Sequence, residues 1–126
     1  MNEKMLRVVL VDDEPYALKI MELILSELPN VCIAGMYTAG EKALAAVEED
    51  RPDAVFMDIE MPGKNGLELA KVLSGTHPEI KVVFVTAYNK YAGAISAIGA
   101  DYLLKPVRKE RLEKALDRLG KGRGCS

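Results

Sequence analysis

Residues 54–66 read Ala-Val-Phe-Met-Asp-Ile-Glu-Met-Pro-Gly-Lys-Asn-Gly, a short apolar run that ends in a carboxylate and a loop. The four apolar residues 54–57 are too few for a helix and fit a strand buried on both faces, as strands are in a parallel sheet. Asp58 then stands at the carboxyl end of this strand. Because open α/β sheets bind ligands outside the carboxyl ends of their strands, Asp58 lies where chemistry is expected.

The pattern of a short apolar run followed by a polar residue recurs along the chain. Further strands are predicted at 6–11, 31–36, 82–85 and 102–104. Apolar residues at helical spacing predict helices at 15–28, 39–49, from 67 to the break at 75, 88–98 and 107–119. The helix at 88–98 is expected to be the weakest, because it contains Gly93 and few strong helix formers. Alternating strands and helices predict a three-layer α/β/α sandwich with right-handed crossovers.

Length and composition predict one domain at 1–119, followed by a tail or linker at 120–126. The chain has 126 residues, 49% of them hydrophobic and 29% charged, which is ordinary for a globular protein. No apolar run approaches the ~20 residues of a membrane span, and no signal-like segment begins the chain. Cys32 and Cys125 have neither disulfide nor metal-site spacing. A cytoplasmic location without membrane contact is therefore expected.

The charge distribution argues against direct binding of nucleic acid. Net charge is -2, and only residues 105–126 are basic, with eight Lys or Arg against three acids. A nucleic-acid-binding domain of this size usually shows a larger basic excess. The basic end is interpreted as a solvated helix face or, alternatively, as a surface for an acidic partner.

Polar residues follow four of the five predicted strands and should converge at one edge of the sheet. They are Asp12 and Asp13, Asp58, Thr86 and Lys105. Three carboxylates in one place raise one another's pKa unless a cation offsets them, and Mg²⁺ prefers such oxygen ligands. The lysine and the hydroxyl could stabilise a phosphoryl group during transfer. Taken singly, Asp12 and Asp13 could merely cap a helix, so only the combination indicates a site.

The same residues, in this order, resemble the receiver domain of response regulators from bacterial two-component systems, the CheY-like superfamily. The motifs are Asp12-Asp13, Asp58 with Met61-Pro62 and Gly66, Thr86-Ala87, and Tyr102 with Lys105-Pro106. The resemblance extends from residue 6 to residue 119. It implies a flavodoxin-like fold, with five helices around a five-stranded parallel sheet of order 2-1-3-4-5.

The resemblance also implies a chemical role for each matching residue. Asp58 would accept a phosphoryl group from a sensor histidine kinase. Asp12, Asp13, Asp58 and the backbone carbonyl of Glu60 would bind Mg²⁺, or Mn²⁺ in its place. Lys105 would pair with the phosphoryl group.

A second set of residues is implied to control the response. Thr86 would hydrogen-bond the phosphoryl oxygen and Tyr102 would rotate inward behind it. Glu60 and Tyr88 would tune the phosphoryl lifetime by controlling the approach of water. The Lys105-Pro106 peptide bond is expected to be cis, which only a proline allows at low cost.

The predicted function is a phosphorylation-activated switch that is not an enzyme beyond phosphorylating and dephosphorylating itself. The runs at 86–88 and 100–106 resemble regulators with a DNA-binding output domain, notably the LytTR type, so control of transcription is expected. That output domain is expected to be absent from this chain. The resemblance further implies a homodimer through the helix at 88–98, the strand at 102–104 and the last helix.

Two alternatives remain. One is a Mg²⁺-dependent phosphatase of the haloacid dehalogenase type, which also uses a nucleophilic aspartate. The Asp-x-Asp pair of such enzymes is absent, because Glu60 stands two residues after Asp58. The other is a stand-alone receiver that acts only by protein–protein contact.

Overall fold

A single parallel sheet forms the middle layer of the computed structural model, which describes residues 5–63 and 65–120. Its strands lie in the order β2-β1-β3-β4-β5, which confirms the expected order. The strands are β1 (Leu6–Val11), β2 (Val31–Tyr37), β3 (Ala54–Met57), β4 (Lys81–Thr86) and β5 (Asp101–Leu104).

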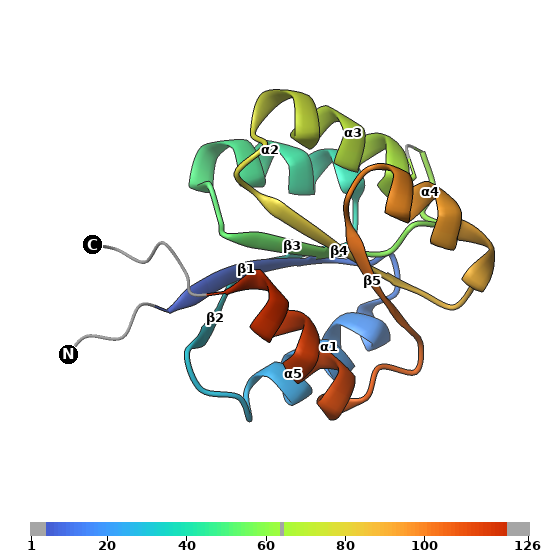
Figure 1. Cartoon of the computed structure of the whole chain (residues 1–126). Coiled ribbons are helices and arrows are strands. Elements are labelled where there is room, and N and C mark those ends of the chain that lie inside the picture. The colour runs from blue at the N-terminus through green and yellow to red at the C-terminus, as the bar shows by residue number, and fades with distance from the viewer. Residues whose placement is uncertain (1–4, 64, 121–126) are drawn as a thin grey trace.

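Within the described residues, five α-helices cover the two faces of this sheet. They are α1 (Pro15–Leu25), α2 (Gly40–Asp50), α3 (Gly66–Thr76), α4 (Ala92–Ala97) and α5 (Lys109–Leu119). Helices α1 and α5 lie on one face, and α2, α3 and α4 lie on the other (Figure 1). The predicted three-layer α/β/α sandwich is therefore confirmed.

The side chains of β1 alternate between the two hydrophobic cores. Leu6, Val8 and Leu10 pack in the core beneath α1 and α5. Val9 and Val11 pack in the core beneath α2, α3 and α4. Because both faces of the central strands are covered, those strands consist almost entirely of apolar residues.

Strand register brings the strand ends to the same edge. Val11 pairs with Met57 and Met57 with Phe84, so β1, β3 and β4 end nearly level. Thr86 at the end of β4 pairs with Leu104 at the end of β5. The residues that follow these strands therefore meet at one edge, as the sequence predicted.

Several element boundaries differ from the prediction. Helix α1 ends at Leu25 rather than at Leu28, where a turn closes with a 3.0 Å hydrogen bond from Leu28 N to Leu25 O. The apolar spacing extends to Leu28 because its side chain is buried, not because the helix continues. The last helix begins at Lys109 rather than at residue 107, with Arg108 in extended conformation as its N-cap.

The segment predicted as a helix over 88–98 is divided in two. A 3₁₀ turn, η1 (Asn89–Tyr91), precedes the six-residue α4. The weak helix formers around Gly93 allow only this short element, which fits the expectation that it is the weakest helix. Of the predicted tail at 120–126, Gly120 ends α5 with a φ of 83°, and residues 121–126 lie outside the described part of the chain. No helix among the described residues is long and apolar enough to cross a bilayer.

Candidate functional site

Three carboxylates meet where β1 and β3 end. Asp12, Asp13 and Asp58 each offer an oxygen within 4.8 Å of the others. The backbone fixes this arrangement, because Asp58 N donates a 3.0 Å hydrogen bond to Val11 O, directly before Asp12. Asp12 and Asp58 are buried, at 5% and 8% exposure. The predicted acidic cluster is thus present in the folded chain.

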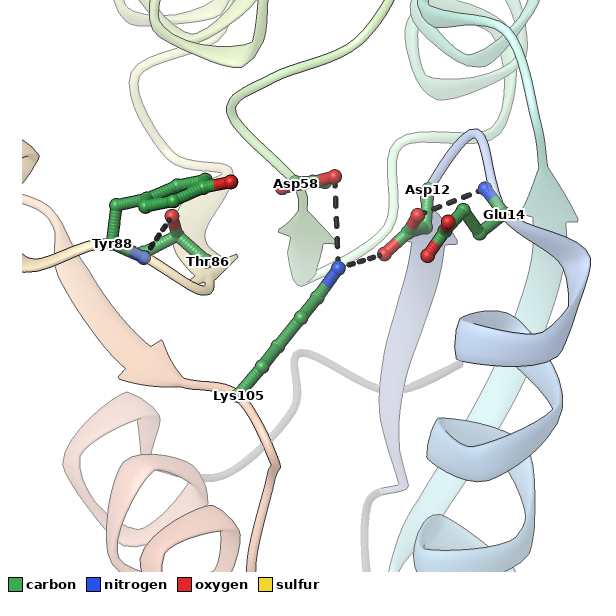
Figure 2. A network of polar contacts seen from close by, with 6 residues as sticks. All are labelled: Asp12, Glu14, Asp58, Thr86, Tyr88 and Lys105. Atoms are coloured by element: carbon green, nitrogen blue, oxygen red, sulfur yellow. Dashed lines mark hydrogen bonds and ion pairs between the residues drawn. The ribbon is translucent and has the colours of Figure 1, made fainter.

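Lys105 reaches the cluster from the end of β5. Its Nζ lies 2.9 Å from Asp12 Oδ2 and 3.6 Å from Asp58 Oδ2, as Figure 2 shows. Its backbone N donates a 2.8 Å hydrogen bond to Thr86 O, which ties the lysine to the end of β4. The Lys105-Pro106 peptide bond is cis, as expected.

The electrostatics of the cluster favour an added cation. Burial raises the pKa of Asp58, and the charges of Asp12 and Asp13 raise it further against the lowering effect of Lys105. Burial alone would lower the pKa of Lys105, but its hydrogen bond to Asp12 and the nearby carboxylates raise the pKa above its ordinary value. One ammonium thus contacts two carboxylates of a cluster of three. This donor set of hard oxygens fits a small divalent cation.

Asp12 also shapes the loop that leads into α1. Its Oδ1 accepts a 3.0 Å hydrogen bond from Glu14 N, while its Oδ2 faces Lys105. The N-cap of α1 is Glu14, and no side chain caps this helix. Helix capping therefore does not account for Asp12, whose second oxygen remains directed at the site.

Thr86 and Tyr102 lie on neighbouring strands behind the cluster. Thr86 is 1% exposed, and its Oγ1 accepts a 3.1 Å hydrogen bond from Tyr88 N, so the hydroxyl is engaged by its own loop (Figure 2). Tyr102 pairs with Phe84 across the β4–β5 ladder. Its half-buried ring packs against the core beneath α2, α3 and α4.

Gly66 and an N-terminal capping box fix the backbone beneath Asp58. A Cβ at Gly66 would collide with Asp58 O and lie 3.0 Å from Ile59 Cα, so only glycine lets α3 begin here. Asn65 Oδ1 accepts from Glu68 N, and Glu68 Oε1 accepts from Asn65 N, each at 3.0 Å. The Asn-x-x-Glu spacing is a recognisable signal for this box.

Sequence reasoning missed two residues beside the site, Lys90 and Tyr91. Tyr91 Oη donates a hydrogen bond to Glu60 Oε2, and Lys90 Nζ lies 3.5 Å from the same oxygen. Tyr88 is half exposed, with Lys90 Nζ 5.2 Å from its ring centroid. The Tyr-Asn-Lys-Tyr run at 88–91 is the available signal, but it does not identify Glu60 as the partner.

Known proteins with related sequences are regulators. Residues 8–117 match the response regulator receiver domain family. The transcriptional regulatory protein BtsR of Escherichia coli is 40% identical over 116 residues, which cover 91% of this chain and 48% of BtsR. An uncharacterized response regulatory protein of Yersinia pestis is 43% identical over 120 residues, covering 93% of this chain and 49% of that protein. The chain thus spans about half the length of these relatives.

Solved structures agree with the sequence matches. The response regulator domain of Thermotoga maritima CheB superimposes with a TM-score of 0.80 at 28% identity, covering 92% of this chain and 97% of that one. The response regulatory domain of mrkE from Klebsiella pneumoniae gives a TM-score of 0.82 at 29% identity, covering 90% and 93%. The chain therefore belongs to the response regulator receiver domain family.

Proposed function

We propose that this chain is a phosphorylation-activated switch and that Asp58 is its phosphoacceptor. One arrangement carries the proposal. Asp58 stands within 4.8 Å of two further carboxylates and 3.6 Å from Lys105 Nζ, at the edge of the sheet where α/β proteins bind ligands. Family membership and the relatives that regulate transcription support it.

The proposed chemistry is transfer of a phosphoryl group from a phosphohistidine of a sensor histidine kinase. An Asp58 oxygen attacks phosphorus, an O–P bond forms and the N–P bond breaks, and the imidazole nitrogen keeps the electron pair. Catalysis of such a step is mainly positioning and charge stabilisation. Lys105 stabilises the oxygens in transfer by exchanging part of its interaction with Asp12 for the phosphoryl group. The later loss of the group by hydrolysis is the only other reaction proposed.

Asp12, Asp13, Asp58 and the backbone carbonyl of Glu60 are the proposed ligands of Mg²⁺, for which Mn²⁺ could substitute. The bound ion would neutralise charge on the phosphoryl oxygens. The carboxylates determine where the donor's phosphoryl group must approach, because the backbone at the end of each strand fixes the position of the aspartate that follows it. Asp12 remains oriented by Glu14 N whether or not Lys105 changes partner.

Thr86 and Tyr102 are the proposed link between phosphorylation and the outer surface. A phosphoryl oxygen would accept a hydrogen bond from the Thr86 hydroxyl, whose oxygen now accepts one from Tyr88 N, and would draw the side chain toward Asp58. Movement of Thr86 would free space for the Tyr102 ring to rotate inward. Such a switch works only if the phosphoryl group binds the moved state better than the present one. Glu60 and Tyr88 are the proposed controls of phosphoryl lifetime.

The remaining parts of the proposal concern the whole protein. The proposed receiver domain is residues 1–119, with 120–126 as a tail or the start of a linker. The proposed output is control of transcription through a DNA-binding domain, notably of the LytTR type. The proposed location is the cytoplasm. The proposed dimer surface is formed by α4, β5 and α5. BtsR is named a transcriptional regulatory protein, which supports this output.

The test is incubation of the chain with Mg²⁺ and a small phosphodonor such as acetyl phosphate, followed by intact mass spectrometry. Wild type should gain one phosphoryl group and Asp58→Asn none. Asp53→Asn is a matched control, because Asp53 is buried directly before the same strand but at its opposite end. Undiminished phosphorylation of Asp58→Asn would contradict the proposal. Steady turnover of a phosphate ester in excess over protein would instead indicate the phosphatase alternative.

A further inference from the structure

Two loops beside the site are joined by a small cluster of side chains, here called the Glu60 latch and made up of Glu60, Lys90 and Tyr91. Tyr91 Oη donates to Glu60 Oε2, and Lys90 Nζ lies 3.5 Å from that oxygen. Lys90 Nζ also lies 5.2 Å from the ring centroid of Tyr91. The carboxylate thus meets a hydroxyl donor and a cation, both from η1.

The latch spans the two strands that carry the chemistry. Glu60 stands two residues after Asp58 on the loop that leaves β3. Tyr91 stands five residues after Thr86 on the segment that leaves β4. Because β3 and β4 are adjacent, the latch connects the loop of the proposed phosphoacceptor to the loop of the proposed switch hydroxyl.

We propose that Tyr91 is a positioning residue that holds Glu60 against η1 and thereby lengthens the lifetime of the phosphoryl group on Asp58. The inference rests on the proposed function, and it goes beyond it by naming what controls the Glu60 side chain. Lys90 assists through its charge. Tyr88 takes part only through Lys90, which lies over its ring.

The physical reason lies in the hydrolysis step that ends the signal. A water oxygen attacks phosphorus, the bond between phosphorus and the Asp58 oxygen breaks, and that oxygen keeps the electron pair while the water loses a proton. A free carboxylate nearby could accept this proton and orient the water. While Tyr91 and Lys90 occupy Glu60 Oε2, that carboxylate is turned to η1. Breaking the latch also loosens two loops that flank Asp58, so both consequences shorten the lifetime.

The experiment follows decay of the phosphorylated chain after the phosphodonor has been removed. Tyr91→Phe should shorten the half-life by a factor of about three or more, because it removes the hydrogen bond and keeps the ring. In a Glu60→Ala background, Tyr91→Phe should change nothing, because residues that act as a unit have non-additive effects.

Controls separate positioning from a loss of stability. Tyr16→Phe removes a tyrosine hydroxyl from an exposed position on α1 and should leave the half-life unchanged. Tyr91→Phe should keep the wild-type melting temperature and the rate of phosphoryl gain. Equal half-lives for wild type and Tyr91→Phe, or an equal effect in the Glu60→Ala background, would overturn the inference alone. Failure of wild type to gain a phosphoryl group would overturn the proposed function, and the inference with it.

Discussion

Replacing Asp58 with asparagine should stabilise the metal-free protein, although it removes the proposed phosphoacceptor. At an effective dielectric constant of about 20, two unit charges within 4.8 Å repel by about 3.5 kcal/mol. Asp58 meets two such repulsions, from Asp12 and Asp13. The attraction between Asp58 and Lys105 Nζ, 3.6 Å away, offsets about 4.6 kcal/mol of this repulsion. A net penalty of roughly 2 kcal/mol remains, and asparagine abolishes it at nearly constant volume.

The pH dependence of this effect follows from the raised pKa of Asp58. Its ordinary value is 3.8, and burial together with the neighbouring carboxylates raises the pKa in the folded state. Well below pH 3.8 the group is protonated in both the folded and the unfolded state, and the two proteins should differ little in stability. As pH rises from 3.8 to the raised pKa of the folded state, wild type loses stability because the folded state resists ionisation. The stability advantage of Asp58→Asn should therefore grow across this interval and remain constant above it.

The assay is thermal unfolding in EDTA at pH 7, read by circular dichroism. For a chain of this length, 2 kcal/mol corresponds to a rise in melting temperature of roughly 5–10 °C. Asp117→Asn makes the same substitution at an exposed position on α5 and should change little. Saturating Mg²⁺ should narrow the difference in melting temperature between Asp58→Asn and wild type, because wild type keeps all three carboxylates. A ligand at about 100 times its Kd stabilises the protein that binds it by about 2.7 kcal/mol. A melting temperature for Asp58→Asn at or below that of wild type in EDTA would refute the electrostatic argument.

Three further predictions address the surroundings of Asp58. Gly66→Ala should lower stability by about 2 kcal/mol and slow phosphoryl gain, because a Cβ collides with the Asp58 backbone; denaturant unfolding and mass spectrometry check both effects. Glu68→Ala removes one half of the capping box and should lower stability by about 1 kcal/mol without preventing phosphorylation, which the same two measurements would show. Thr86→Val should still gain the phosphoryl group, but phosphorylation should no longer shift the backbone NMR resonances of β5. If phosphorylation shifts these resonances in Thr86→Val as it does in wild type, the role of Thr86 as the link is contradicted.

The sequence predicted those parts of the fold that depend on buried strands. A strand covered on both faces must be apolar, so the strands are visible as short runs, and a parallel sheet brings their ends to one edge. Asp12, Asp58, Thr86 and Lys105 could therefore be grouped from the sequence alone. Resemblance to a family then supplied the cis bond before Pro106, which the structure contains.

The parts that escaped prediction depend on how loops run. Glu60 and Tyr91 are 31 residues apart, and their contact needs both the path of the loop after β3 and the 3₁₀ turn that replaces the first part of an expected helix. The spacing of apolar residues along the sequence does not indicate such a turn. The capping box at Asn65 and Glu68 is different, because its signal is local: the Asn-x-x-Glu spacing could have indicated it, although it was not predicted.

The position of Lys105 explains how one charge could serve both the resting and the phosphorylated protein. Its Nζ now lies nearer to Asp12 than to Asp58, at 2.9 Å against 3.6 Å. A phosphoryl group on Asp58 would add negative charge next to the carboxylate with which Lys105 now interacts more weakly, so the ammonium should shift toward Asp58. The backbone need not follow, because the Lys105 N–H is held by Thr86 O. That same hydrogen bond places the lysine backbone directly against the residue proposed to move. Lys105 and Thr86 should therefore respond to the phosphoryl group together, and substitution of either should weaken the response of the other.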